Sequence, residues 1–322
     1  MKKKVTIYVL MITTELICTF SRPLIARTEK VVETPLFNQQ SLSFSSPIVF
    51  NKETLKTQAL INPHRKPINT NLTKTERKQI RKQFETLVHH KDAKALSCEE
   101  LRQAIDFCLQ LEWNEKALLY LQEFLQKTKD ASLIESLKLE IADLLFQMGK
   151  LIEAEQGFDQ YLDLYPGSQY AEYAHYKRTI CLFYQTLKTD QDQGPTRKAI
   201  QLAESYLEKG LAYKQYRSQI IDIRKQCQLM LFENEKTVFD FYMKRKSYGA
   251  ANGRLAYLKQ QYLQELPHVE PTIIQLECRL AQAQGNTQLY QERLAHLQQK
   301  FPEYNKTVKV AQKSSKSYST KF

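Results

Sequence analysis

The side chains that could ligate a metal or act as nucleophiles are six histidines and six cysteines in a chain of 322 residues. Metal centres and catalytic pairs need such side chains at short, defined spacings, such as HExxH or CxxC. No histidine or cysteine here has such a spacing, and the sequence contains neither a GxxxxGK(S/T) phosphate loop nor a Gly-x-Ser-x-Gly elbow. We therefore expect no enzyme activity, no metal site and no cofactor.

Packing explains the cysteines better than reactivity does. Cys108, Cys181 and Cys278 stand among apolar residues at helical spacing. Free cysteine is one of the most frequently buried residue types, so we expect buried thiols. Disulfide bonds remain an alternative if the chain is exported to an oxidising compartment.

Aromatic and basic side chains are the candidates for binding. One group falls along a single expected helix and comprises Tyr170, Tyr173, Tyr176 and Tyr184. A second group follows closer to the C-terminus and comprises Tyr242, Tyr248, Tyr257, Arg245 and Arg254. Two interpretations are open: the side chains form the core of the fold with hydroxyls at its rim, or they line a concave face that grips a peptide or an acidic protein patch. Tyrosine and arginine are both favoured at interface hot spots.

Helices are the elements that would position these groups. Glycine is scarce, at 8 residues, and the straight side chains of Leu, Gln, Glu and Lys are frequent, which favours helix because they lose little rotamer freedom there. Three hydroxyl–acid pairs have the spacing of a capping box, the signature of a helix start. They are Thr73 with Glu76, Ser97 with Glu100, and Ser132 with Glu135.

A pattern of glycine, small or apolar residues and proline recurs along the chain. Gly149 is followed by Ala154, Phe158, Tyr161 and Pro166, and the same distances relate Gly285 to Tyr290, Leu294, Leu297 and Pro302. Glycine tolerates the left-handed conformation that ends a helix, and proline stops the next one. A helix pair of about 34 residues with this pattern is the tetratricopeptide repeat.

We therefore predict an all-α fold, a right-handed α-solenoid of about five tetratricopeptide-type helix pairs. The expected pairs span 97–131, 132–167, 168–210, 215–267 and 268–305, with a further helix from Thr73. Gly249 and Gly253 are expected to let two helices approach closely. The rival interpretation is an irregular helical bundle.

The two ends of the chain differ from this centre. Residues 1–26 combine a basic start with a short apolar run, the layout of an export signal or membrane anchor, with lipidation at Cys18 or cleavage after Ala26 as competing routes. Residues 27–72 predict a flexible linker, 73–305 the repeat domain and 306–322 a basic disordered tail. The net charge of +12 suggests an anionic partner, but much of it lies in these ends, so we expect no nucleic acid and membrane contact only through the N-terminus.

Two stretches resemble the BamD family, the tetratricopeptide lipoproteins of the bacterial outer-membrane β-barrel assembly machine. One is "YPGSQYAEYAHYKRTICLFY", and the stronger is "NEKTVFDFYMKRKSYGAANGRLAYL". The family pattern in the second stretch falls on Glu235, Val238, Phe241–Tyr242, Lys244–Arg245, Tyr248, Ala250–Ala251 and Arg254. The resemblance covers about 97–305.

The resemblance implies a non-catalytic adaptor on the periplasmic side of the outer membrane. Its partners would be unfolded barrel precursors and the barrel assembly subunit, and Arg245, Tyr248, Arg254 and Tyr257 would form part of the docking surface. The helix from Tyr170 to Tyr184 is the second candidate surface. Two other functions remain open: a generic periplasmic tetratricopeptide scaffold in envelope division or secretion, and a cytoplasmic adaptor or chaperone.

Overall fold

The structure is a computed structural model that describes residues 71–186 and 191–302. The predicted export signal with Cys18, nearly all of the predicted linker and the predicted basic tail lie outside the described residues. Within the described ranges the chain forms eleven α-helices and three short 3-10 helices, and no strand. The all-α prediction is therefore confirmed.

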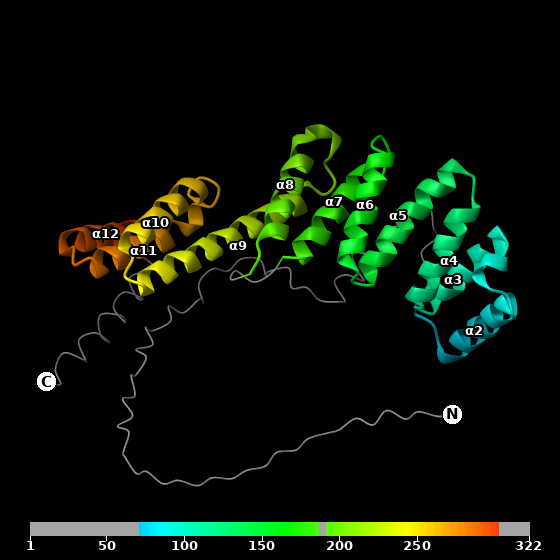
Figure 1. Ribbon diagram of the computed structural model, residues 1–322. Helices are drawn as coiled ribbons and strands as arrows, with labels where there is room; N and C mark the ends of the chain where they lie inside the picture. The colour runs from blue at the N-terminus through cyan, green and yellow to red at the C-terminus, as the bar shows by residue number, and fades with distance from the viewer. Residues whose placement is uncertain (1–70, 187–190, 303–322) are drawn as a thin grey trace, which may run out of the picture. The chain divides into compact units, whose positions relative to one another are not determined.

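Ten of these helices form the five expected pairs (Figure 1). The pairs are α3 (Cys98–Gln110) with α4 (Asn114–Lys127), α5 (Ala131–Gln147) with α6 (Leu151–Leu164), α7 (Ala171–Tyr184) with α8 (Gly194–Glu208), α9 (Arg217–Lys244) with α10 (Tyr248–Tyr262), and α11 (Glu270–Ala283) with α12 (Thr287–Lys300). Helix α2 (Lys74–Val88) precedes them, and the 3-10 helices are η1 (Ala93–Ala95), η2 (Gly210–Ala212) and η3 (Pro267–Val269).

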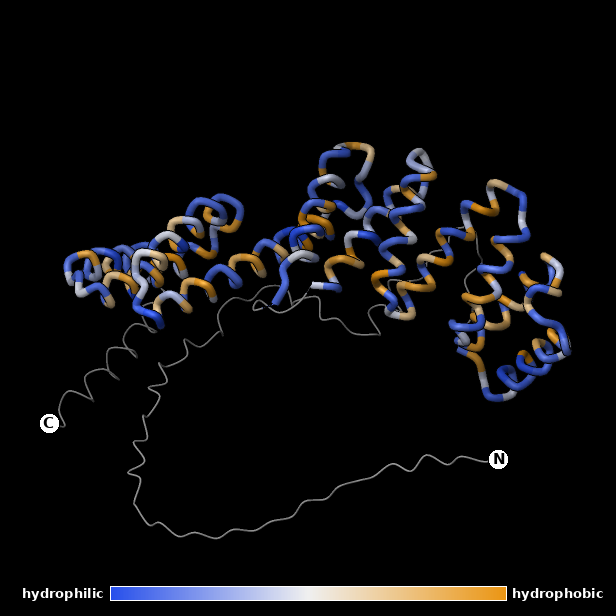
Figure 2. Tube along the Cα trace, in the orientation of Figure 1, coloured by the Kyte–Doolittle hydropathy of each residue, from blue (hydrophilic) through white to orange (hydrophobic). Residues whose placement is uncertain are grey.

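Every helix packs against the next one along the chain, and α7 also contacts α9. Hydrophobic residues recur along each helix between hydrophilic ones (Figure 2), as expected of helices that bury one face. The buried side chains form successive cores in chain order, from the core of α2–α5 to the small core of α11 and α12. Because α7 and α9 belong to adjacent helix pairs, each of these contacts lies within a pair or between adjacent pairs or helices, as expected of a solenoid.

Four of the five turns inside the pairs use one backbone geometry, and the turn between α7 and α8 includes residues 187–190, which lie outside the described residues. After α5 the N–H of Lys150 bonds to the carbonyl oxygen of Leu145 and that of Gly149 to Phe146, with Gly149 at a φ of 75°. These two hydrogen bonds, together with a residue in the left-handed conformation, form the Schellman motif. Gly285 repeats it at a φ of 73°, as the glycine pattern predicts. Glu112 and Lys246 adopt the same geometry, with φ of 58° and 57°, without being glycine.

Two of the three predicted capping boxes are confirmed, at Thr73 with Glu76 and at Ser97 with Glu100. The third, at Ser132, is wrong. Helix α5 begins at Ala131, two residues earlier than a cap at Ser132 requires, and the carboxylate of Asp130 accepts hydrogen bonds from the backbone N–H groups of Ser132 and Leu133. An acidic N-cap serves as well as a hydroxyl, and it leaves Glu135 available for a contact with the next helix.

The expected close approach at Gly249 and Gly253 is also wrong. A Cβ atom added at either glycine would meet nothing within 4 Å. The tight contact occurs instead at Gly157 on α6, where an added Cβ would lie 3.0 Å from the Cβ of Ala142 on α5. Ala154, one turn earlier on α6, is fully buried as predicted.

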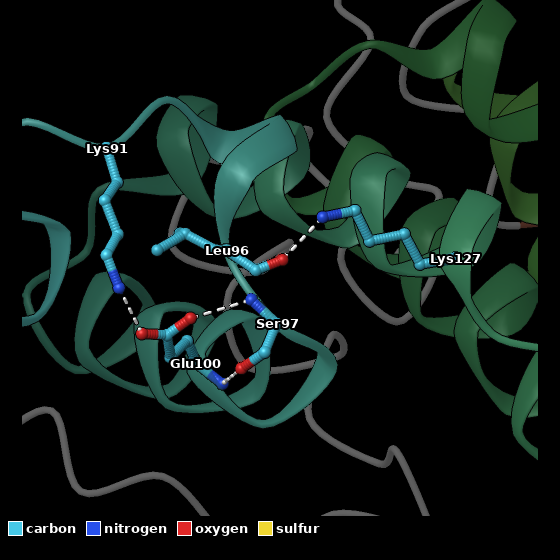
Figure 3. Close-up of polar contacts among 5 residues, drawn as sticks. All are labelled: Lys91, Leu96, Ser97, Glu100 and Lys127. Carbon is cyan, nitrogen blue, oxygen red and sulfur yellow. Dashed lines mark hydrogen bonds and ion pairs between the residues drawn. The ribbon is translucent and has the colours of Figure 1, made fainter.

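In the first pair, the start of α3 is tied to the end of α4 (Figure 3). Glu100 accepts hydrogen bonds from Lys91 Nζ at 2.6 Å and from the backbone N–H of Ser97 at 2.7 Å, and these bonds, chiefly that of Lys91, lower the pKa of Glu100 to about 2. Lys127, the last residue of α4, donates to the carbonyl oxygen of Leu96 at 2.5 Å. Lys127 is thus a cation at the C-terminus of α4, where it is favourable, and it also satisfies a backbone carbonyl just before α3.

The corresponding ends meet in later pairs through other side chains. The hydroxyl of Tyr161 donates to Glu135 Oε1 at 2.8 Å, and that of Tyr206 donates to Glu172 Oε1 at 2.5 Å. In the last pair, Lys300 Nζ donates to Glu270 Oε1 at 2.5 Å. A contact between the second helix's C-terminal end and the first helix's N-terminal end therefore recurs with changing chemistry.

Helix α9 is the longest described helix, with 28 residues. Its first half contributes Ile220, Ile223 and Cys227 to the core shared with α5–α8. Its second half contributes Phe232 and Phe239 to the core shared with α10 and α11. One continuous helix therefore belongs to two cores.

Candidate docking surface

The turn between α9 and α10 carries the first group of predicted binding residues. Arg245 is the C-cap of α9 and is exposed, and its guanidinium lies 4.5 Å from the ring centroid of Phe241. Phe241 is itself 47% exposed. Arg245 has no carboxylate partner among the described residues. A guanidinium stacked on an aromatic ring keeps its N–H donors available for a carboxylate of another molecule.

Arg254 has a different environment. Its Nη1 lies 3.1 Å from Glu235 Oε2, and Glu235 is only 9% exposed. This ion pair links α10 to α9, so Arg254 has a partner within the helix pair. Among the described residues no hydrogen bond, ion pair or ring contact joins Arg254 to Arg245.

The two tyrosines predicted beside these arginines also differ. Tyr257 is 40% exposed and stands edge-on to Tyr262, with ring centroids 6.4 Å apart. Tyr248 is half-buried and packs against the core of α9–α11. Of the predicted binding residues in this pair, Arg245 and Tyr257 are therefore exposed, and Phe241 joins them as an exposed aromatic residue. The exposure of Phe241 is not predictable from the sequence, since a phenylalanine in an amphipathic helix is expected in the core.

The tyrosines of α7 are largely core residues. Tyr173 is 8% exposed and its hydroxyl donates to Asp143 Oδ1 at 2.7 Å. Tyr176 stacks on Tyr216, the N-cap residue of α9, with centroids 4.2 Å apart and planes at 5°. Tyr170 and Tyr184 are half-buried and reach the surface. A small pocket of about 90 Å³ lies beside Tyr184, between α7 and α9.

A buried charged cluster contacts Tyr173, and it was not predicted from the sequence. Lys177 on α7 is fully buried, with its Nζ 4.2 Å from the ring centroid of Phe146, and Asp143 on α5 is 4% exposed. Burial raises the pKa of Asp143 to about 7, although Lys177 and the Tyr173 hydroxyl oppose the rise. Burial lowers the pKa of Lys177, and the charge of Asp143 opposes that shift. The only signal in the sequence is a lysine within an otherwise apolar helical face.

His175 is a second buried titratable group on α7. It is 7% exposed, and its ring stands edge-on to Tyr206 and Tyr213 at 5.7 and 5.9 Å. Burial, and to a lesser extent the positive charges of Arg178 and Lys209, lowers its pKa to about 4. It is a neutral packing residue at neutral pH.

Metal sites, reactive cysteines and membrane-spanning helices find little support in the described part of the chain. Within it, no three His, Cys, Asp or Glu side chains are arranged to hold a metal ion. Cys108, Cys181 and Cys278 are buried and unpaired, as predicted, and burial raises the pKa of Cys108 to about 12 and that of Cys278 to about 11. None of the described helices combines the length and the apolar composition that a bilayer crossing requires.

Five consecutive helix pairs with contacts between neighbours define a tetratricopeptide-type α-solenoid, a class that offers extended binding surfaces. The chain belongs to the YfiO family of outer membrane lipoproteins, whose sequence model matches residues 97–293, from the N-cap of α3 into α12. This match supports the resemblance to BamD. A comparison with curated proteins finds no match to the chain.

Proposed function

We propose that the protein is a non-catalytic adaptor on the periplasmic side of the outer membrane, which docks the barrel assembly subunit and binds unfolded β-barrel precursors. The observation that carries the proposal is the extent of the family match, which begins at the first helix pair and runs into the last helix. A stack of helix pairs offers a long surface for an extended chain or a partner domain. Cys18 is the proposed lipid attachment site.

We assign the docking of the assembly subunit to the exposed side chains of the α9–α10 pair, Phe241, Arg245 and Tyr257. On α9, Phe241 is 47% exposed and lies against Arg245, which has no carboxylate partner among the described residues. On α10, Tyr257 is 40% exposed. Aromatic side chains and arginine supply most binding energy at protein interfaces. The partner surface should therefore present a carboxylate beside an apolar pocket. Tyr248 and Arg254 support this surface from within the pair, and Tyr170 and Tyr184 are the second candidate site.

The test is co-purification of the full-length protein with the barrel assembly subunit from solubilised envelopes. Arg245→Glu combined with Tyr257→Ala should abolish co-purification while helicity and melting temperature persist, because neither side chain is buried. Lys214→Glu, a charge reversal at another exposed position, is the matched control and should bind normally. Arg254→Glu is unsuitable as a probe, since it would place two carboxylates together at Glu235.

Three outcomes separate the alternatives. Normal binding by the stable double variant moves the interface elsewhere, first to Tyr170 and Tyr184. Failure of the wild-type protein to co-purify with the assembly subunit favours a generic periplasmic scaffold. Recovery of the protein in the cytoplasmic fraction favours the cytoplasmic adaptor or chaperone.

A further inference from the structure

Helix α2 has an asymmetric charge distribution. Phe84 is its buried residue and faces the core of α2–α5. At about 100° per residue, one flank beside Phe84 carries Lys74, Lys78, Arg81 and Lys82, all exposed, with Glu85 as the acid among them. The opposite flank is largely uncharged and carries Thr75, Gln79, Gln83 and Thr86. The basic residues therefore gather on one side of the helix.

Trp113 extends this flank from the turn between α3 and α4. It is the single tryptophan of the chain and is partly exposed. Two cations lie near its ring, with the Arg81 guanidinium carbon at 5.4 Å and Lys116 Nζ at 4.5 Å from the centroid, and the ring stands edge-on to Phe84 at 5.5 Å. Such a ring presents an apolar body beside charged groups, which suits the boundary between water and lipid headgroups.

The positive charge of this flank is only partly compensated, since Glu85 is the one described carboxylate among its four basic side chains. Lys74, Lys78 and Lys82 form no ion pair with a described carboxylate, whereas nearby Lys91 is paired with Glu100. A cluster of lysines and arginines with an excess of positive charge attracts anionic surfaces, and each basic residue near an anionic bilayer contributes about 1 kcal/mol.

We propose that this flank of α2, with Lys74, Lys78, Arg81 and Lys82 together with Lys116 and Trp113, rests on the surface of an anionic phospholipid bilayer. The inference rests on the membrane attachment that the proposed function includes. Helix α2 is the first described helix after residues 1–70, and a lipid anchor there would hold it close to a bilayer, which raises its effective concentration at the surface. Helix α2 lies outside the family match, which begins at residue 97. An acidic protein would satisfy the same charges, but the tether and Trp113 favour the bilayer.

The single tryptophan provides the measurement. Full-length protein is mixed with vesicles that contain a dansyl-labelled headgroup lipid, and energy transfer from Trp113 reports the approach of this flank whether or not the N-terminal segment inserts. Vesicles of phosphatidylcholine alone are compared with vesicles that also contain phosphatidylglycerol. We expect transfer with phosphatidylglycerol, little without it, and loss of transfer at high salt, because salt screens exposed charges.

Two matched triple variants test the residues. Lys74→Gln, Lys78→Gln and Lys82→Gln remove three charges from the flank, and Lys209→Gln, Lys214→Gln and Lys225→Gln remove three exposed charges elsewhere. Each lysine should contribute about fivefold to the affinity for the bilayer, so the first variant should need on the order of 100-fold more lipid for half-maximal transfer. The second should behave like the wild-type protein. Circular dichroism confirms that both remain folded.

The inference is overturned if transfer is absent, if it is equal with both kinds of vesicle, or if both triple variants lose it equally. It is also overturned if the first variant keeps its transfer but no longer captures an acidic protein, because the flank would then be a protein site. Failure of the proposed function is a separate result: the wild-type protein would not co-purify with the assembly subunit, yet the transfer would remain.

Discussion

Helices α5–α8 and helices α9–α12 each form two consecutive helix pairs, but the two regions bury different side chains. The first region encloses a set of buried polar or charged side chains, which includes Asp143, His175, Lys177, Thr179 and Thr196. In the second region, Glu235 is the one side chain of this kind among the described residues. The same arrangement of helix pairs thus accommodates a core with several buried polar side chains and a core that is almost wholly apolar. Directional hydrogen bonds specify the geometry of the first region, and apolar packing with ion pairs at the rim holds the second.

The largest expected effect is the loss of the buried cation of the first region. Lys177→Met should lower the free energy of unfolding by about 3–5 kcal/mol, because it leaves the carboxylate of Asp143 buried without its opposite charge. The double variant with Asp143→Leu should recover most of this loss. Urea unfolding near pH 8 measures both values, and the loss should shrink at lower pH as Asp143 takes up a proton.

Arg254→Met is the matched control in the second region. The Arg254 side chain is 41% exposed, so its ion pair with Glu235 should be worth only about 1 kcal/mol. Equal losses at Lys177 and Arg254 would remove the distinction between the two regions.

The next effect is a pH dependence that His175 confers on the first region. Burial lowers its pKa from 6.5 to about 4, so between these values the unfolded chain binds a proton that the folded chain does not. The free energy of unfolding should therefore fall as the pH drops through this window, by up to about 3 kcal/mol. His175→Phe keeps an aromatic ring against Tyr206 and Tyr213 and should remove this part of the decline.

Denaturation curves from pH 7 to pH 4 give the difference between the wild-type protein and this variant. The same substitution at His296, an exposed residue of α12, is the control from the second region. A difference curve that is flat for His175→Phe would show that the histidine is solvated and not part of a closed interior.

The smallest effect concerns how closely helices approach in each region. Gly157→Ala should destabilise by about 1–3 kcal/mol, because the new methyl group would lie 3.0 Å from the Cβ of Ala142. Gly253→Ala should stabilise by about 0.5–1 kcal/mol, since nothing lies near its Cβ position and alanine favours helix. The two melting temperatures should move in opposite directions, and a shift of both in the same direction would contradict the assigned contacts.

The sequence predicts the fold well because its determinants are local. Glycine, small residue and proline at fixed distances identify the turn after α5 and the one after α11, and the same Schellman geometry occurs at Glu112 and Lys246. Those two turns could not be recognised from residue type, because neither residue is glycine and the fold itself imposes the positive φ. At the start of α5 the residue types were ambiguous: Ser132 and Asp130, two residues earlier, both suit an N-cap, and the structure has Asp130 there.

The candidate site was less predictable. Arg245 and Tyr257 were expected at a binding surface and are exposed, but the sequence could not distinguish them from Arg254, whose partner Glu235 lies on the preceding helix. The buried pair of Asp143 and Lys177 was missed because charged residues are rarely buried, and nothing local marks the exception. Tyr173 was expected to be a candidate contact and is held in the core by Asp143.

Helix α9 also has a consequence for the order in which the protein folds. Contacts between neighbouring helices have short sequence separations, which favour rapid folding and let structure spread from any pair to the next. Spreading from α5–α8 toward α10–α12 has to pass along α9, because its first half lies in one core and its second half in the other. The two regions can therefore nucleate independently, but each becomes fully stable only when α9 is complete, so this helix makes their folding cooperative.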